Sequence, residues 1–372
     1  MKGALALCLL PAAAVAAHGQ TASVDSFEDL ARRAEAVLDS RPAEAAGFYK
    51  QALAIRPEWA EGWMYLGGAL YQAERYAEAT DAFRKGIALT PNLGTAWAFL
   101  GLCEAELDNP DQALADIRKG ETLGLGNNQE FEIAVRVKAA QILIRSSAFN
   151  DSLDQLQILG LRGVTSPALE VTMGLARLGV PSAFSQLAPE RQAVVALAGK
   201  AAWAAGSWRP TEAAAAYEEL MKRYPNEPGV RYVYGLYLME TDLVAALAEF
   251  RKEIQTNPKH WPTLLAIASL EIRRGAPEAA IPTLQSAMKL VPPGQRWQCH
   301  AELGRANMAA DNLDAAIPEF EAAARLMPSI PQLHLYLSQA YRRAGKDTEA
   351  QKESAEFQKL KSQQDPLGVP GK

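Results

Sequence analysis

The chain has 372 residues, of which 49% are hydrophobic, and its 38 basic and 43 acidic residues give a formal net charge of -5. Nucleic-acid binding depends on an excess of positive charge, so we expect no nucleic-acid partner. A chain of this length normally forms two or three domains, unless repeats that contact only their neighbours let one array grow.

The first nineteen residues differ in composition from the rest. Lys2 is followed by an uncharged apolar stretch, Ala4 to Ala17, and small residues end it at Ala14-Val15-Ala16 or Ala17-His18-Gly19. This pattern predicts a cleavable secretory signal peptide over residues 1–19. The stretch is shorter than the about 20 residues that span a bilayer. We therefore expect export to the periplasm or exterior and no transmembrane span in the mature chain.

The main part of the chain contains a repeat close to 34 residues long. Most repeats have a bulky side chain four residues after a fixed alanine, as in Phe83 and Phe320, and a large-small pair about twelve before it, as in Leu66-Gly67. This period predicts stacked helical hairpins rather than a globular enzyme core. The fixed alanines are Ala45, Ala79, Ala113, Ala213, Ala246, Ala280, Ala316 and Ala350.

Each repeated position has a physical explanation. Two antiparallel helices approach closely where small side chains face each other, so we expect the glycine of the first helix to meet the alanine of the second. The bulky residue one turn later then fills the gap to the next hairpin. A proline twelve residues after the alanine, such as Pro57 or Pro91, stops the second helix because proline lacks an amide hydrogen.

These residues resemble the tetratricopeptide repeat family, whose pattern places Trp, Leu-Gly, Tyr, Ala, Phe, Ala and Pro along each unit. The resemblance is closest between Ala60 and Leu93. It implies an all-α fold, a right-handed superhelical solenoid of antiparallel helix hairpins.

The register divides the chain into several segments. Residues 20–127 are predicted to form an N-terminal array of three hairpins, of which the first is divergent, and residues 194–362 a C-terminal array of five. Between them, residues 128–193 lose the register and are predicted to form a degenerate hairpin and an irregular helical connector. The connector is either a hinge or an irregular part of one stack, and we favour the stack. Residues 363–372 are predicted to be a disordered tail.

Catalytic signatures are absent from the sequence. There is no His-Glu-x-x-His motif, phosphate loop or nucleophile elbow, so we expect neither an enzyme nor a bound metal or cofactor. His300 and His334 are one repeat apart, which places them too far from each other to share a metal ion. Trp63 and Trp97 occupy the same phase, and we interpret both histidines as packing residues.

In the family, a second stripe on each first helix lines a concave groove that receives peptides or proteins. Carried over to this chain, the stripe includes Met64, Ala98 and Leu102. Its charge changes along the chain, from the acidic Glu61 and Glu106 in early units to arginines in late ones. Arginine beside apolar surface suits a carboxylate-bearing partner, so we predict an acidic segment at the C-terminal arm. Alternatively, these arginines are solvated or pair with Glu271, Glu302 or Glu349. The groove candidates are Tyr71, Tyr232, Met239, Arg273, Arg305, Met308, Gln339, Arg342 and Arg343.

The sequence leaves two classes of function open. The favoured one is a non-enzymatic scaffold of the cell envelope or exterior that binds a protein or peptide segment. The alternative is a module that binds an envelope glycan or other non-protein polymer, with Trp59, Trp208, Trp261 and Trp297 as candidate stacking surfaces near hairpin ends. No feature of the sequence indicates an oligomeric state.

Overall fold

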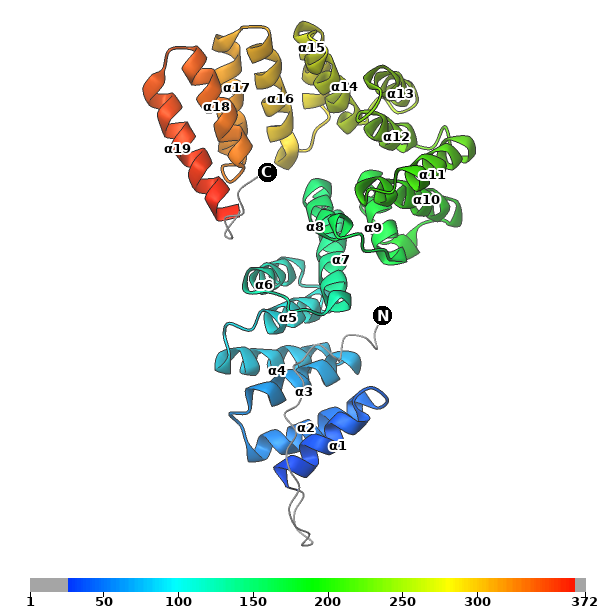
Figure 1. The fold of residues 1–372 in the computed structure, drawn as a ribbon, viewed down its shortest axis with the longest axis vertical. Helices are drawn as coiled ribbons and strands as arrows, with labels where there is room; N and C mark the ends of the chain where they lie inside the picture. The colour runs from blue at the N-terminus through cyan, green and yellow to red at the C-terminus, as the bar shows by residue number, and fades with distance from the viewer. Residues whose placement is uncertain (1–25, 365–372) are drawn as a thin grey trace. The chain divides into compact units, whose positions relative to one another are not determined.

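The structure, a computed structural model, describes residues 26–364 and contains α-helices and no strand in that part of the chain (Figure 1). The prediction of an all-α fold is confirmed. The predicted signal peptide, residues 1–19, lies outside the described residues. So does the predicted tail, except that the last helix extends to Gln364.

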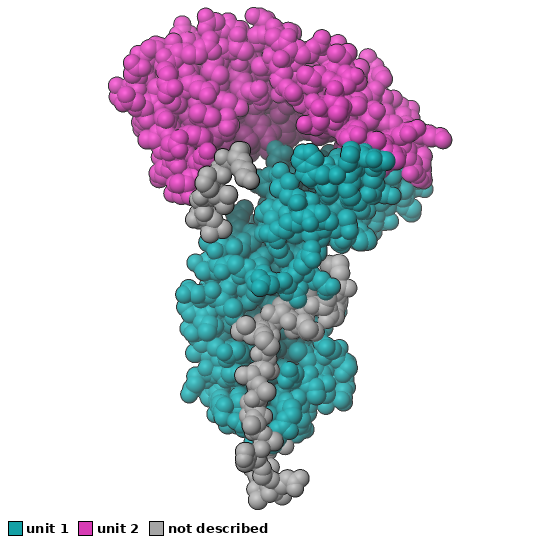
Figure 2. Space-filling view, viewed as in Figure 1, with its two compact units in different colours: residues 1–213 teal, residues 214–372 magenta. Residues whose placement is uncertain are grey.

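The chain divides between residues 213 and 214 into two compact units, coloured separately in Figure 2. Unit 1 is the part up to residue 213 and unit 2 the part from residue 214. This division falls inside helix α11, and the boundaries drawn from the sequence near residues 127 and 193 stay predictions.

Unit 1 consists of helices that pair in chain order, α1 with α2 through to α9 with α10. Its helices are α1 (Phe27–Val37), α2 (Pro42–Ile55), α3 (Ala60–Gln72), α4 (Tyr76–Leu89), α5 (Gly94–Glu106), α6 (Pro110–Leu123), α7 (Gln129–Arg145), α8 (Phe149–Leu161), α9 (Pro167–Arg177), the 3-10 helix η2 (Phe184–Gln186) and α10 (Pro189–Gly206).

Unit 2 continues the same pairing, α12 with α13 through to α18 with α19. The helix α11 (Pro210–Arg223) crosses the division between the units. It is followed by α12 (Val230–Leu238), α13 (Leu243–Thr256), α14 (Trp261–Arg273), α15 (Pro277–Met288), the 3-10 helix η3 (Pro293–Gln295), α16 (Arg296–Ala309), α17 (Leu313–Leu326), α18 (Pro331–Arg343) and α19 (Asp347–Gln364).

The surroundings of the glycine in the first helix differ between hairpins. Gly67 of α3 faces the ring of Phe83 in α4, where an added Cβ atom would lie 2.7 Å from the ring, and Gly304 faces Phe320 in the same way at 2.6 Å. In these two hairpins the atoms nearest to the glycine belong to the aromatic ring, so the glycine makes room for that ring. At Gly101 of α5 the atom nearest to an added Cβ is the carbonyl oxygen of the repeat alanine Ala113, at 2.7 Å, which is the approach expected from the sequence.

The same aromatic rings also connect successive hairpins, as predicted. Phe83 stacks on Phe99 of α5 with ring centroids 5.3 Å apart, and Phe99 lies 4.5 Å from Phe131 of α7. In unit 2, Phe320 lies 5.4 Å from Tyr336 of α18. In the hairpins of Phe83 and Phe320, one aromatic ring thus fills both the space within its hairpin and the gap to the next.

At one position of the repeat, occupied by Trp63, Trp97 and His334, a ring nitrogen forms a hydrogen bond to the carbonyl oxygen of the proline six residues earlier. The Nε1 atoms of Trp63 and Trp97 donate to the carbonyl oxygens six residues earlier, at 2.7 and 2.9 Å. His334 places its Nε2 atom 2.9 Å from the Pro328 carbonyl oxygen, and its Nδ1 atom lies 2.6 Å from Glu353. His300 makes the equivalent carboxylate contact with Glu319 at 2.7 Å. The interpretation of both histidines as packing residues is supported by these contacts.

The segment that lost the repeat register is nevertheless helical. Helices α7 and α8 pair with each other, and α9 packs on α10 where Gly174 and Gly199 bring the two backbones together. The Nε1 atom of buried Trp203 donates to the Val164 carbonyl oxygen at 2.9 Å, which fixes α10 to the loop before α9. Two facing glycines permit this spacing because neither carries a Cβ atom.

Candidate functional site

Tyr71 begins a continuous stripe across the first helices of three consecutive hairpins. Its half-buried ring on α3 lies 5.4 Å from Tyr76 and 6.2 Å from Phe99 between centroids. Burial and the nearby charge of Glu106 raise the pKa of the Tyr71 phenol above its ordinary value. Glu106 of α5 in turn forms an ion pair with Lys138 of α7 at 2.7 Å. Residues of α3, α5 and α7 therefore share one mixed polar and aromatic face.

Tyr232 of α12 and Met239, the residue after that helix, are half-buried in the core of unit 2. The ring of Tyr232 lies 5.9 Å from the Phe250 ring and meets the His260 ring edge-on at 4.9 Å. These contacts tie α12 to α13 and to the start of α14. Both side chains therefore contribute to the packing of the hydrophobic core.

Two of the four candidate arginines already have partners. The Nη1 atom of Arg305 donates to both carboxylate oxygens of Glu302, at 2.6 and 2.9 Å, and its guanidinium lies 5.9 Å from the centre of the Tyr336 ring. Arg343 donates to Asp311 at 2.6 Å and to the Met308 carbonyl oxygen at 2.9 Å. Arg305 therefore pairs with Glu302, as the alternative interpretation expected. Arg343 is also paired, but with Asp311, which was not among the expected partners.

The other two arginines, Arg273 and Arg342, are exposed and form no ion pair with any residue in the described range 26–364. Gln339, one turn before Arg342 on α18, is exposed as well. Helix α16 contacts both α14, which Arg273 ends, and α18. A ligand that reaches both arginines therefore has to extend across three first helices.

Other members of the expected stripe belong to the core. Met64, Ala98 and Leu102 are buried. Met64 contacts Gly86 of α4, and Ala98 lies against Gly120 of α6. Because these glycines have no side chain, the second helix of each hairpin packs close enough to bury these residues of the first helix. Placing these three residues on an open groove was wrong, because helical register alone does not reveal how closely two helices approach.

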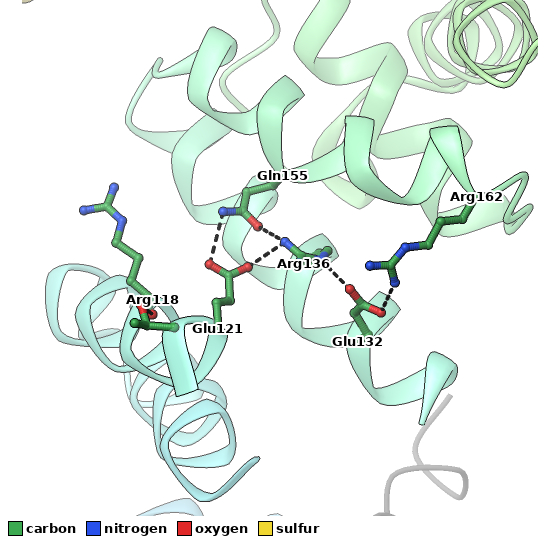
Figure 3. Close-up of polar contacts among 7 residues, drawn as sticks. Arg118, Glu121, Glu132, Arg136, Gln155 and Arg162 are labelled. Carbon is green, nitrogen blue, oxygen red and sulfur yellow. Dashed lines mark hydrogen bonds and ion pairs between the residues drawn. The ribbon is translucent and has the colours of Figure 1, made fainter. Parts of the chain in front are cut away.

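A buried ion network between α6, α7 and α8 was not expected from the sequence (Figure 3). Its centre is Arg136, whose side chain is only 11% exposed. Arg136 donates to Glu121 at 2.8 Å, to Glu132 at 3.0 Å and to Gln155 at 3.3 Å. Arg162 donates to the second oxygen of Glu132 at 2.7 Å. The two carboxylates and two guanidinium groups balance one another.

The network lines one side of an open hollow of about 520 Å³ that also contacts Leu125, Leu159 and Val164. The hollow lies beside the irregular loop between α6 and α7, where Gly124 and Gly126 adopt positive φ angles. Because every charged group of the network has a partner of opposite charge, its clearest role is to fix α7 and α8 to the preceding hairpin. Of its contacts, only Glu132 with Arg136 has the i,i+4 spacing that sequence reasoning can detect.

Residues 26–364 provide neither a metal site nor a membrane-spanning helix. No group of three or more His, Cys, Asp or Glu side chains there is arranged to hold a metal ion. In the same range, no helix combines the length and apolar character needed to cross a membrane.

Helical hairpins with an aromatic-over-glycine contact define a helical-repeat protein. One tetratricopeptide repeat model matches residues 60–93, and a second matches residues 196–260 and 301–356. The chain belongs to the tetratricopeptide repeat family, whose members are generally protein-interaction scaffolds.

The chain also shows similarity to solved structures of MamA. For residues 41 to the end of MamA from Desulfovibrio magneticus RS-1, the identity is 20% and the TM-score 0.41, over 46% of this chain and 97% of that one. Another MamA crystal structure gives 17% identity and a TM-score of 0.40, over 49% of this chain and 99% of the other. No curated protein matches the chain.

Proposed function

We propose that the protein is a non-enzymatic scaffold that binds a segment of a partner protein along the first helices of its hairpins. An acidic part of that segment binds in the C-terminal array. The observation that carries the proposal is the difference among the arginines. Arg305 and Arg343 are paired internally, whereas Arg273 and Arg342 are exposed without an ion pair among the described residues. Exposed guanidinium groups can each take a carboxylate in a bidentate arrangement.

Arg305 supports this surface although it is paired. Its Nη1 atom satisfies both oxygens of Glu302, and no other acceptor among the described residues is bonded to its Nε and Nη2 atoms. The neighbouring Tyr336 ring restricts the guanidinium further. A ligand carboxylate would meet a group whose conformational freedom is already reduced, which lowers the entropic cost of binding.

The test uses a fluorescent twelve-residue peptide of alternating aspartate and leucine, measured by polarization. Charge reversal at both exposed sites, Arg273→Glu with Arg342→Glu, is expected to weaken binding at least about five-fold and to reduce its salt dependence. The matched control is Arg325→Glu, an exposed arginine on the second helix α17. Equal affinities for the double variant and the control would contradict the proposal.

We further propose that the protein acts in the cell envelope or outside the cell. The support is the apolar segment before residue 19, which has the length and ending of a secretory signal. Intact-mass spectrometry of the exported chain should give a protein that begins after Ala16 or Gly19. A full-length mass in the cytoplasmic fraction alone would contradict export without affecting the proposed binding surface.

A further inference from the structure

Trp208 occupies a turn position that other hairpins give to small or polar residues. Its backbone is left-handed, with a φ of 57°. L-residues with bulky side chains are disfavoured in this region, so the turn geometry does not explain a tryptophan. Positions of the same kind, between the helices of other hairpins, hold Glu74, Asp108, Ser147, Gly275, Asp311 and Gly345.

The hydrophobic core does not explain Trp208 either. The residue is 82% exposed, more than any other large hydrophobic residue in the described part of the chain. The remaining candidates for stacking surfaces are packed: Trp59 lies 4.9 Å from the Phe27 ring, and Trp261 and Trp297 border core clusters. Of the four tryptophans considered from the sequence, only Trp208 is exposed.

The surroundings of Trp208 are rigid and polar. The amide of Arg209 donates to the Ala204 carbonyl oxygen at 2.9 Å, which fixes the turn. The Arg209 guanidinium forms an ion pair with Glu212 at 2.6 Å, and both side chains are partly exposed. Nearby, Gly160 of α8 lies against the end of α10.

We propose that Trp208 is a stacking platform for a carbohydrate, specifically a ring of a hexopyranose chain. Such a ring presents an apolar C–H face to the electron-rich face of an indole. Its hydroxyl groups can donate hydrogen bonds to the carboxylate of Glu212, whose side chain is 38% exposed. An indole on a fixed backbone loses little conformational freedom when a ligand stacks on it.

The size of the surface argues for a sugar rather than a protein partner. A stable protein interface covers about 800 Å² on each side, far more than one indole provides. Interface tryptophans also tend to fill desolvated pockets. Trp208 instead stands at a turn with most of its surface open. The proposal does not depend on the peptide surface of the first helices.

Thermal stability separates a ligand-binding role for Trp208 from a structural one. Trp208→Gly removes the left-handed strain and is expected to raise the melting temperature by about 2 °C. A decrease of similar size would show that the indole supports the fold and would overturn the proposal. Trp208→Phe keeps an aromatic face and is expected to bind the sugar more weakly than the wild type.

Binding is measured by ¹⁹F NMR on protein labelled with 5-fluorotryptophan, in which the Gly variant identifies the Trp208 signal. Cellotetraose and chitotetraose are expected to shift this signal with millimolar affinity, while the signals of Trp63 and Trp97 stay unchanged. A Trp208 signal that neither sugar moves up to about 20 mM would overturn the proposal, since that corresponds to less than about 2.3 kcal/mol of binding free energy. A shift caused only by a leucine- and phenylalanine-rich peptide would assign the site to a protein partner instead.

Discussion

The ring of Phe83 covers Gly67 so closely that a Cβ atom on the glycine would lie within 2.7 Å of it. The same relationship recurs between Gly304 and Phe320 in unit 2. The Phe83 ring cannot move away from Gly67 easily, because it also stacks on Phe99 of the next hairpin. The absence of a side chain at this glycine is therefore a condition for the stacking of successive hairpins.

Replacing Gly67 by Ala should lower the free energy of unfolding by about 1–3 kcal/mol, because overpacking outweighs the gain of about 1 kcal/mol in helix propensity. Gly47 provides the control, since it is exposed in α2 with no atom near its missing Cβ. Gly47→Ala should raise the free energy of unfolding by about 0.5–1 kcal/mol. Urea unfolding followed by circular dichroism measures both, and stabilisation by both changes would contradict the packing argument.

Removing the centre of the ion network should be costly. Arg136→Met leaves Glu121 and Glu132, whose side chains are 17% and 13% exposed, without their shared partner. We expect a loss of about 3 kcal/mol, because a nearly buried charge without its partner is strongly destabilising. Hydrogen exchange should show the largest loss of protection in α7 and α8.

An exposed ion pair provides the comparison. Arg32→Met removes the pair with Asp29 on α1, where both side chains are more than half exposed. This change should alter stability by less than about 0.5 kcal/mol. Similar losses for the two arginines would show that the network in Figure 3 contributes no more than a surface pair.

The protein should lose stability in mild acid through His260. Burial lowers the pKa of His260 from 6.5 to about 4. Below pH 6.5 the unfolded chain therefore binds a proton that the folded chain does not bind until near pH 4. The contribution of neutral His260 is present above pH 6.5, decreases as the pH falls and levels off below about 4, amounting to about 3 kcal/mol.

Urea titrations at several pH values test this expectation. His260→Gln removes the titrating ring, so the variant should show a smaller decrease in the free energy of unfolding between pH 6.5 and 4 than the wild type. An identical decrease in both proteins would assign the acid sensitivity to other groups.

Both cysteines of the described chain should be unreactive in the native state. Burial raises the pKa of the Cys299 thiol to about 12, and burial likewise raises the pKa of Cys103. At pH 8 almost no thiolate is then present, and the reactive species in alkylation is the thiolate. A chromogenic disulfide should label neither thiol within the time in which it labels both in guanidinium chloride. Rapid labelling of the native protein would mean that one of the two helices opens readily.

Sequence reasoning was most successful where the repeat specifies local geometry. Hairpin helices, the buried alanines and the equivalence of His334 with Trp63 all follow from spacing, because residues with the same phase meet the same surroundings in each unit. It failed for Met64 and Ala98, whose burial depends on how closely a second helix approaches. The partners of Arg136 and Arg343 were also missed, since these contacts join residues of different helices.

By itself, the sequence determined that this protein is a tetratricopeptide repeat chain of helical hairpins, because a period of about 34 residues constrains backbone, turns and core together. Only the tertiary structure decided which side chains remain available to a ligand. Arg273, Arg342 and Trp208 are open, while Arg305, Arg343 and the other candidate tryptophans are engaged. Periodicity describes what repeats share, whereas availability depends on distances between helices that differ from one repeat to the next.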